Sequence, residues 1–230
     1  FVFKIDRAAS GTCSVCGWKI PDTKKIRAVY EELGVKWTWT AMAENGIHMG
    51  SLRSSQATVV HTSPEHHYPL GTVMSARRRQ ELLKWLEESE EHYIIEDDYD
   101  CEFRYNGHSI PALFGLDTSG RVIYMNTFSK TLSPGIRISY MVLPQTLAER
   151  FYRELSFYSC TVSNFEQYTL AEFIENGSFE KHINRLRNYY QNKRDLILRA
   201  LEKKPLGDYV TIEEEEAGVH FLMHLRTDLK

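Results

Sequence analysis

The sequence has no long apolar run, few cysteines and no excess of positive charge, and each of these absences excludes a class of protein. No stretch reaches the length of about eighteen apolar residues that a membrane-spanning helix needs. The first residues also lack the apolar segment and cleavage site of a signal peptide, so we expect a cytoplasmic location and no contact with a membrane. A net charge of -3 provides no general attraction to nucleic acid.

The four cysteines are too few and too scattered to form a disulfide framework. Cys13 and Cys16 have the spacing of half a zinc site or of a redox motif, and both remain alternatives, although no second pair completes a zinc site. The one tight basic cluster, Arg77-Arg78-Arg79, precedes acidic residues, and we expect it to be the solvated start of a helix.

Apolar runs alternate with helical patterns, which predicts an α/β fold with a mostly parallel sheet. A helix is expected from Thr23 to Gly34, and another after Ser75, which can cap it. The expected strands cover residues 35–40, 57–62, 93–97, 122–125 and 138–143.

After Pro144 the pattern changes to helices, expected over residues 146–158, 164–175 and 178–203, followed by strands in 209–212 and 218–224. Residues 1–22 fit none of this, although Phe1 to Ile5 alternate as a strand would, and we treat them as an atypical N-terminal segment. The predicted domains are therefore 1–22, then 23–176 as a large domain, and 177–230 as a linking helix with the start of a small domain.

The loop from Thr127 to Arg137 follows a predicted strand and combines a lysine with hydroxyls and an arginine. Hydroxyls, loop amides and a guanidinium suit a phosphate group. A partly shielded lysine beside a bound dianion could form a Schiff base with an aldehyde cofactor. The alternative is a solvated Ser/Thr-rich loop whose lysine has no function.

The strand over residues 93–97 runs directly into a cluster of acids. Ligands of parallel α/β sheets bind beyond the carboxyl ends of the strands, so Asp97 and Lys130 are expected on one rim. An aspartate there could keep a pyridine nitrogen protonated. The alternatives are a charged turn, or a metal site built from Glu96, Asp97, Asp98 and Asp100.

Three blocks of the sequence, 62–71 (TSPEHHYPLG), 96–105 (EDDYDCEFRY) and 127–137 (TFSKTLSPGIR), resemble those of fold-type I, aspartate-aminotransferase-like enzymes that use pyridoxal 5'-phosphate (PLP). Within that group they are most similar to the MocR branch of GntR-type bacterial transcription regulators. The resemblance extends from about Lys24 to the C-terminus.

The resemblance implies a role for each matching residue. Lys130 would form the Schiff base and act as the catalytic lysine, Asp97 would pair with the pyridine nitrogen, and Tyr99 would hydrogen-bond the phenolic oxygen of PLP. His66 would lie near the ring, or it is simply a polar loop histidine close to His61 and His67. The phosphate ligands would be Thr127, Ser129 and Arg137.

The resemblance also implies partners. These are an amino acid or amine, a second copy of the chain, and DNA bound only through a winged-helix domain that this sequence does not contain. A fold-type I subunit is longer than 230 residues, and no residue here matches the arginine that holds a substrate carboxylate. We therefore expect a partial domain that either transaminates, senses an effector without turnover, or is an inactive fragment.

Overall fold

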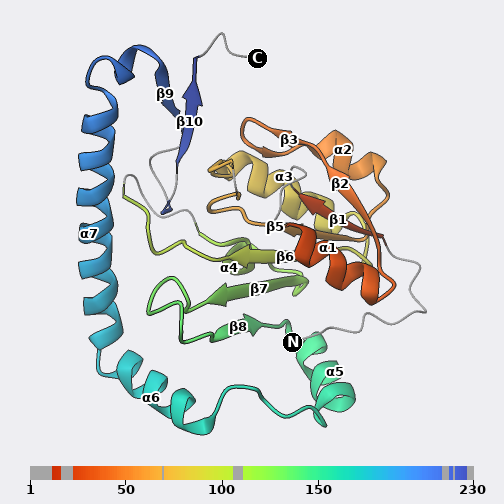
Figure 1. The fold of residues 1–230 in the computed structure, drawn as a ribbon. Helices are drawn as coiled ribbons and strands as arrows, with labels where there is room; N and C mark the ends of the chain where they lie inside the picture. The colour runs from red at the N-terminus through yellow and green to blue at the C-terminus, as the bar shows by residue number, and fades with distance from the viewer. Residues whose placement is uncertain are drawn as a thin grey trace. The chain divides into compact units, whose positions relative to one another are not determined.

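The computed structural model describes residues 12–16, 23–68, 70–105, 111–213, 218–219 and 221–226. They form two compact units, drawn together in Figure 1. Among the described residues, the first unit contains those up to Tyr99, 111–126 and Tyr140–Ala148. The second contains 100–105, Thr127–Ser139 and those from Glu149 onward. The domain boundaries predicted from the sequence at 22/23 and 176/177 stay predictions.

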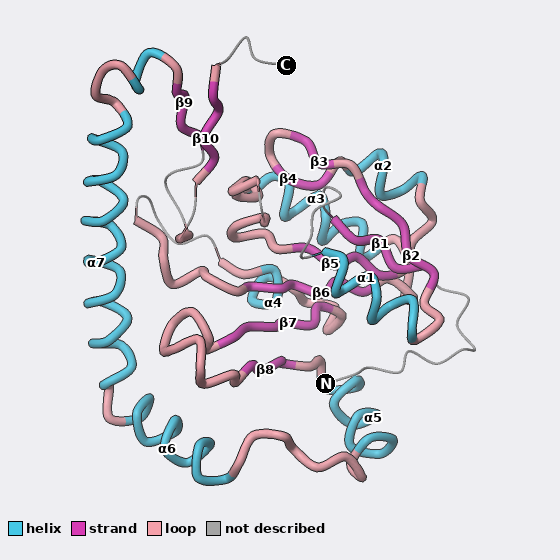
Figure 2. Tube along the Cα trace, viewed as in Figure 1, coloured by secondary structure: helices cyan, strands magenta, loops and turns pink. Residues whose placement is uncertain are grey.

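The first unit is built on a sheet with the strand order β2-β1-β5-β6-β7-β8, and the strands from β2 to β7 pair in parallel (Figure 2). Short apolar runs such as Val122-Ile123-Tyr124-Met125 form strands because both of their faces can be covered. The final residue of β7 and the first residue of β8 belong to the second unit. The strands are β1 (Thr12–Cys16), β2 (Lys36–Thr40), β5 (Val59–Thr62), β6 (Tyr93–Asp98), β7 (Val122–Thr127) and β8 (Ser139–Val142).

The core of this unit lies on one face of the sheet. Val60, Ile94 and Val122 are fully buried and stand side by side in the strand register. They pack with apolar residues of α2 (Met49–Ser54), α3 (Ala76–Glu87) and α4 (Leu113–Leu116), among them Leu52, Trp85 and Leu113. Side chains alternate between the two faces of a sheet along each strand. His61, which follows Val60, and Asp97, three residues after Ile94, therefore point to the face opposite the core.

The remaining elements of the first unit are α1 (Thr23–Glu32) and the hairpin of β3 (Met42–Ala43) and β4 (Gly46–Ile47). Helix α1 ends before Gly34, whose φ of +70° is a conformation that glycine adopts without strain. The helix expected after Ser75 is confirmed, since the Ser75 side chain accepts a hydrogen bond from the Arg78 backbone N–H.

The second unit is mainly helical. It contains most of α5 (Gln145–Leu155), α6 (Asn164–Glu175) and α7 (Ser178–Leu201), followed by the short helix η1 (Leu206–Asp208). Strands β9 (Val210–Glu213) and β10 (Leu222–Leu225) pair in antiparallel fashion. Ser163 and Glu166 form a reciprocal capping box at the start of α6.

Two expectations from the sequence need correction. Thr12–Cys16, which we assigned to an atypical segment, forms a strand between β2 and β5. The strand suggested for Phe1 to Ile5 lies outside the described residues. The arginine cluster is not a uniformly solvated helix start, because the Arg79 side chain is fully buried and donates to Glu65 at 2.9 Å.

Candidate cofactor site

Asp97 stands at the carboxyl end of β6 on the face opposite the core. Its Oδ2 lies 3.4 Å from Nε2 of His61, which comes from the neighbouring strand β5. Nδ1 of His61 in turn lies 2.8 Å from the hydroxyl of Tyr30 on α1. The Asp97 side chain is 32% exposed, so the histidine fixes a carboxylate that a ligand can still reach.

The neighbouring acids point to the other face and are already engaged. Glu96 accepts hydrogen bonds from the backbone N–H groups of Leu113 (2.9 Å) and Phe114 (2.8 Å). Burial raises the pKa of Glu96, and these two hydrogen bonds oppose the rise. Asp98 accepts from the hydroxyl of Tyr124 at 2.9 Å. Within the described ranges, no group of three or more His, Cys, Asp or Glu side chains is placed to hold a metal ion.

Tyr99 and His66, both predicted ring contacts, lie together in the first unit. The Tyr99 hydroxyl donates to the His66 carbonyl oxygen at 2.8 Å, and the two ring centroids are 6.1 Å apart. His66 is buried, with 2% of its surface exposed. The structure therefore brings these two residues together, while their contacts with a cofactor stay predictions.

Sequence reasoning gave no role to three further residues of this region, namely Tyr30, His61 and His67. His67 is 4% exposed, and neither of its ring nitrogens has a hydrogen-bond partner in the described part of the chain. Burial, with smaller contributions from His66 and His61, lowers the pKa of His67 to about 4. The sequence did contain one signal for His61. His61 pairs with Ile95, two residues before Asp97, so the alternation of side chains along a strand places His61 and Asp97 on the same face of the sheet.

Two of the three predicted phosphate ligands, Thr127 and Ser129, lie together in the second unit. The Thr127 Oγ1 lies 3.1 Å from Oγ of Ser129 and 3.1 Å from Oγ of Ser139. It also accepts from the Ser129 backbone N–H at 3.2 Å. Three hydroxyls and a loop amide therefore converge at the carboxyl end of β7, and Ser139 joins the two hydroxyls predicted from the sequence.

Lys130 and Arg137 belong to the same unit, and both side chains are exposed. The Lys130 loop is closed at its base by a hydrogen bond of 2.9 Å from the Phe128 N–H to the Ile138 carbonyl oxygen. Arg137 has a φ of 50°, in the left-handed region that a non-glycine residue seldom adopts. Backbone strain of this kind is concentrated at functional sites.

The predicted site residues therefore fall into two sets. His66, Asp97 and Tyr99 lie in the first unit, whereas Lys130 and the phosphate ligands lie in the second. The expectation that Asp97 and Lys130 share one rim stays a prediction.

Known proteins match both the sequence and the fold. The family model described as "Aminotransferase class I and II" matches residues 36–229. The chain belongs to the class I and II aminotransferase family. This confirms the α/β, fold-type I class predicted from the three sequence blocks. The family model begins at Lys36, so β1 lies outside the matched range.

Two curated relatives within this aminotransferase family are regulators. The chain is 43% identical over 207 residues to the uncharacterized HTH-type transcriptional regulator YdeL of Bacillus subtilis, covering 90% of this chain and 44% of YdeL. It is 40% identical over 164 residues to the probable rhizopine catabolism regulatory protein MocR of Rhizobium meliloti, covering 71% of this chain and 33% of that protein. The predicted resemblance to the MocR branch is confirmed, and the chain spans less than half the length of these relatives.

A solved aminotransferase has the same fold. Kynurenine aminotransferase from Pyrococcus horikoshii, crystallised with PMP, is 28% identical and superposes with a TM-score of 0.71. The match covers 90% of this chain and 52% of that enzyme. In the described part of the chain, no helix is long and apolar enough to cross a membrane.

Proposed function

We propose that this chain is the PLP-binding, aminotransferase-like domain of a MocR-type transcription regulator. The observation that carries the proposal is the placement of Asp97, a partly exposed carboxylate at the carboxyl end of a parallel strand, where His61 holds it at 3.4 Å. Ligands of parallel α/β sheets bind beyond this end of the strands. The family match and the relatives that are regulators support the same assignment.

The described residues fit the chemistry of this cofactor. When bound, PLP supplies an aldehyde and an electron-withdrawing pyridine ring. Asp97 would accept a hydrogen bond from the ring nitrogen and keep its proton in place. Tyr99 would donate to the phenolic oxygen, and His66 would lie near the ring. Lys130 would bind the aldehyde carbon covalently through Nζ.

The phosphate would be held by Thr127, Ser129 and Arg137. The convergent hydroxyls of Thr127 and Ser129 and the guanidinium of Arg137 offer donors of the kind that phosphate oxygens accept. Ser139 extends this group, because its hydroxyl lies 3.1 Å from that of Thr127.

The partners follow from the same assignment. We propose that the domain binds an amino acid or amine, forms a homodimer and acts in the cytoplasm, and that a separate winged-helix domain of the whole protein binds DNA. The alternative proposal is that the domain binds PLP and an amino compound without completing turnover. Release of a keto acid by the whole regulator at a steady rate would contradict that alternative.

The test is an absorption titration of the purified chain with PLP, followed by borohydride reduction and mapping of the modified peptide. We expect a visible band whose reduction labels Lys130, and loss of the band in Lys130→Ala. Lys36→Ala is the matched control, since Lys36 is an exposed lysine on β2. Labelling that persists in Lys130→Ala, or labelling of several surface lysines, would refute the assignment of Lys130.

A further inference from the structure

Helix α7 has one face that is engaged within its own unit. Phe103, which is fully buried, packs edge-to-face on Tyr190 with ring centroids 5.2 Å apart. Arg187 Nε donates to the Glu102 carbonyl oxygen at 3.0 Å, and Ile183 is 6% exposed. The apolar stripe of the helix is thereby used in packing around Ile183 and Tyr190, whereas Leu196 and Ile197 further along the helix are 67% and 44% exposed.

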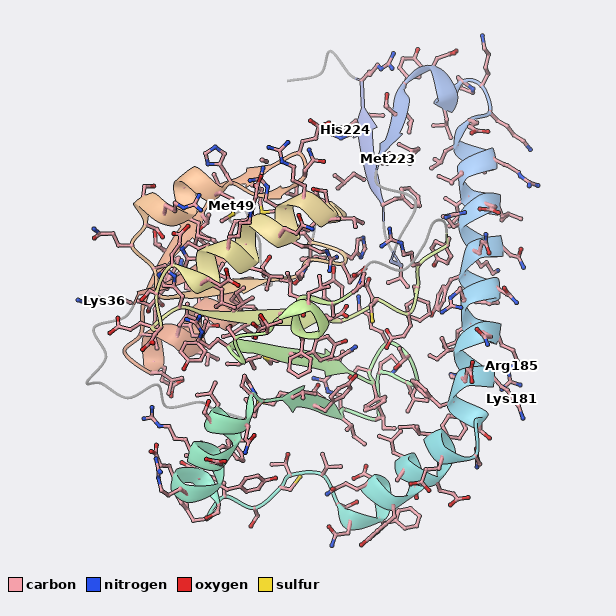
Figure 3. The ribbon with its side chains drawn as sticks, turned by 180° about the vertical axis from the view of Figure 1, so that it is seen from behind. Lys36, Met49, Lys181, Arg185, Met223 and His224 are labelled. Atoms are coloured by element: carbon pink, nitrogen blue, oxygen red, sulfur yellow. The ribbon has the colours of Figure 1, made fainter. Side chains whose placement is uncertain are left out.

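The opposite face of α7 carries a row of cations and amides. Lys181, Arg185, Asn188, Asn192 and Arg199 are all exposed and follow the spacing i, i+4, i+7, i+11, i+18. At about 100° per residue these positions fall within an arc of roughly 60°. Figure 3 shows the labelled Lys181 and Arg185 side chains extending outward from the helix. We call these five residues the basic stripe.

The cations of the basic stripe are not held in ion pairs within the described part of the chain. No described residue forms an ion pair with its three cations, Lys181, Arg185 and Arg199. Two acids flank Arg199 on this side: Asp195, which pairs with Arg194 at 2.8 Å, and the exposed Glu202 at the end of the helix. A row of free cations spaced by amide groups favours a polyanionic partner, although the chain as a whole carries a net charge of -3.

We propose that the basic stripe of α7 binds the phosphate backbone of double-stranded DNA. At about 1.5 Å per residue the stripe is about 27 Å long, and duplex DNA presents a phosphate charge every ~1.7 Å of its axis. Lysine, arginine and asparagine side chains are common donors to phosphate oxygens, and such contacts position a protein without reading sequence. The inference rests on the proposed function, since a regulator bound to its operator holds this domain close to DNA, and it departs from the expectation that DNA is bound only through the winged-helix domain.

DNA fits the stripe better than a membrane surface does. A helix that lies on a membrane inserts an apolar face beside its cations. The apolar face of α7 instead packs against residues 102–105 around Tyr190, and the exposed Leu196 and Tyr189 beside the stripe are separated from that face. Neither Asn188 nor Asn192 adds apolar area to this face.

The test compares two triple variants of the full 230-residue chain that lose the same charge. Lys181→Gln/Arg185→Gln/Arg199→Gln removes the stripe, and Lys36→Gln/Arg77→Gln/Lys84→Gln removes three exposed cations elsewhere. The probe is a fluorescein-labelled duplex of mixed sequence, titrated by anisotropy at several salt concentrations. Circular dichroism checks that both variants fold.

We expect the stripe variant to bind the duplex at least about tenfold more weakly at low salt and to lose ~2–3 from the slope of log K against log salt. The control variant should keep the wild-type slope. Equal weakening in both variants, no binding by the wild-type chain at low salt, or binding to phosphatidylserine vesicles instead of DNA would overturn the inference. PLP absorbance measured on the same samples separates the two proposals, because a chain that does not bind PLP can still bind DNA through the stripe.

Discussion

At the residue scale, Tyr30 is the side chain through which α1 holds the histidine beside Asp97. Removing its hydroxyl in Tyr30→Phe takes away the part-buried contact of 2.8 Å to His61 Nδ1, and a lost hydrogen bond of this kind costs about 0.5–1.5 kcal/mol. Because His61 then no longer fixes Asp97 against the ring nitrogen, we expect PLP to bind about tenfold more weakly in an absorption titration. Tyr93→Phe on β6 is the matched control. Unchanged PLP affinity in Tyr30→Phe would show that Asp97 does not depend on this chain of contacts.

His67 gives the folded protein a specific dependence on pH. Its pKa is about 4 in the folded chain and near the usual 6.5 when unfolded, so the unfolded state binds more protons between these values. Stability is therefore complete above pH 6.5 and falls as the pH drops towards 4, by on the order of 3 kcal/mol from this group.

Urea unfolding at pH 7 and pH 4.5 tests this dependence. In His67→Phe the loss of stability between the two pH values should shrink, since the variant has no imidazole to protonate. The exposed His224 serves as the control position, where His224→Gln should leave the difference unchanged. A pH dependence that is identical in the wild type and His67→Phe would contradict the prediction.

At the scale of elements, Arg79 ties helix α3 to the segment that carries His66. Its guanidinium donates to the Glu65 carboxylate and to the carbonyl oxygens of Pro64, Met74 and Pro111 at 2.9–3.2 Å. Arg79→Met removes this shared donor from a buried carboxylate, which we expect to cost about 3–5 kcal/mol in urea unfolding. Arg77→Met, at a side chain that is 89% exposed, should stay within about 0.5 kcal/mol of the wild type. Equal losses of unfolding free energy in the two variants would show that the buried contacts of Arg79 do not contribute to stability.

Local patterns predicted most elements but not all of the chain. Strands β6 and β7 were predicted because their apolar runs end at Asp97 and at the Lys130 loop. Strand β1 was missed because its place between β2 and β5 depends on pairing with distant residues. The burial of Arg79 could have been found, because Leu82 and Leu86 follow it at the i+3 and i+7 positions of the core face.

The residues of the candidate site could also be predicted from the sequence only in part. The motif blocks identified Asp97 and the hydroxyls around Thr127, since these lie within or next to single strands. The contact of Tyr30 with His61 joins residues 31 positions apart, and no local pattern shows it. The domain boundaries and the site roles taken from the resemblance stay predictions.

At the scale of the whole molecule, the second unit exposes aromatic side chains that a monomer would be expected to cover. Phe157, Phe165 and Tyr168 are each more than 70% exposed, and they lie on the stretch from Tyr152 to Tyr168. Large exposed apolar side chains on one short stretch are typical of a surface that contacts another protein. We assign this exposed aromatic stretch to the homodimer that the proposed function includes.

Sedimentation velocity over a range of concentrations tests that assignment. We expect the wild-type chain to associate, and Phe157→Ser/Phe165→Ser to raise the dimer Kd at least about tenfold, because aromatic anchors at an interface contribute about 2 kcal/mol or more each. The control is Leu206→Ser/Tyr209→Ser, which removes two side chains exposed to 51% and 54% outside the stretch. A wild-type chain that stays monomeric at every concentration, or equal effects of the two variants, would show that these aromatics contact something other than a second copy.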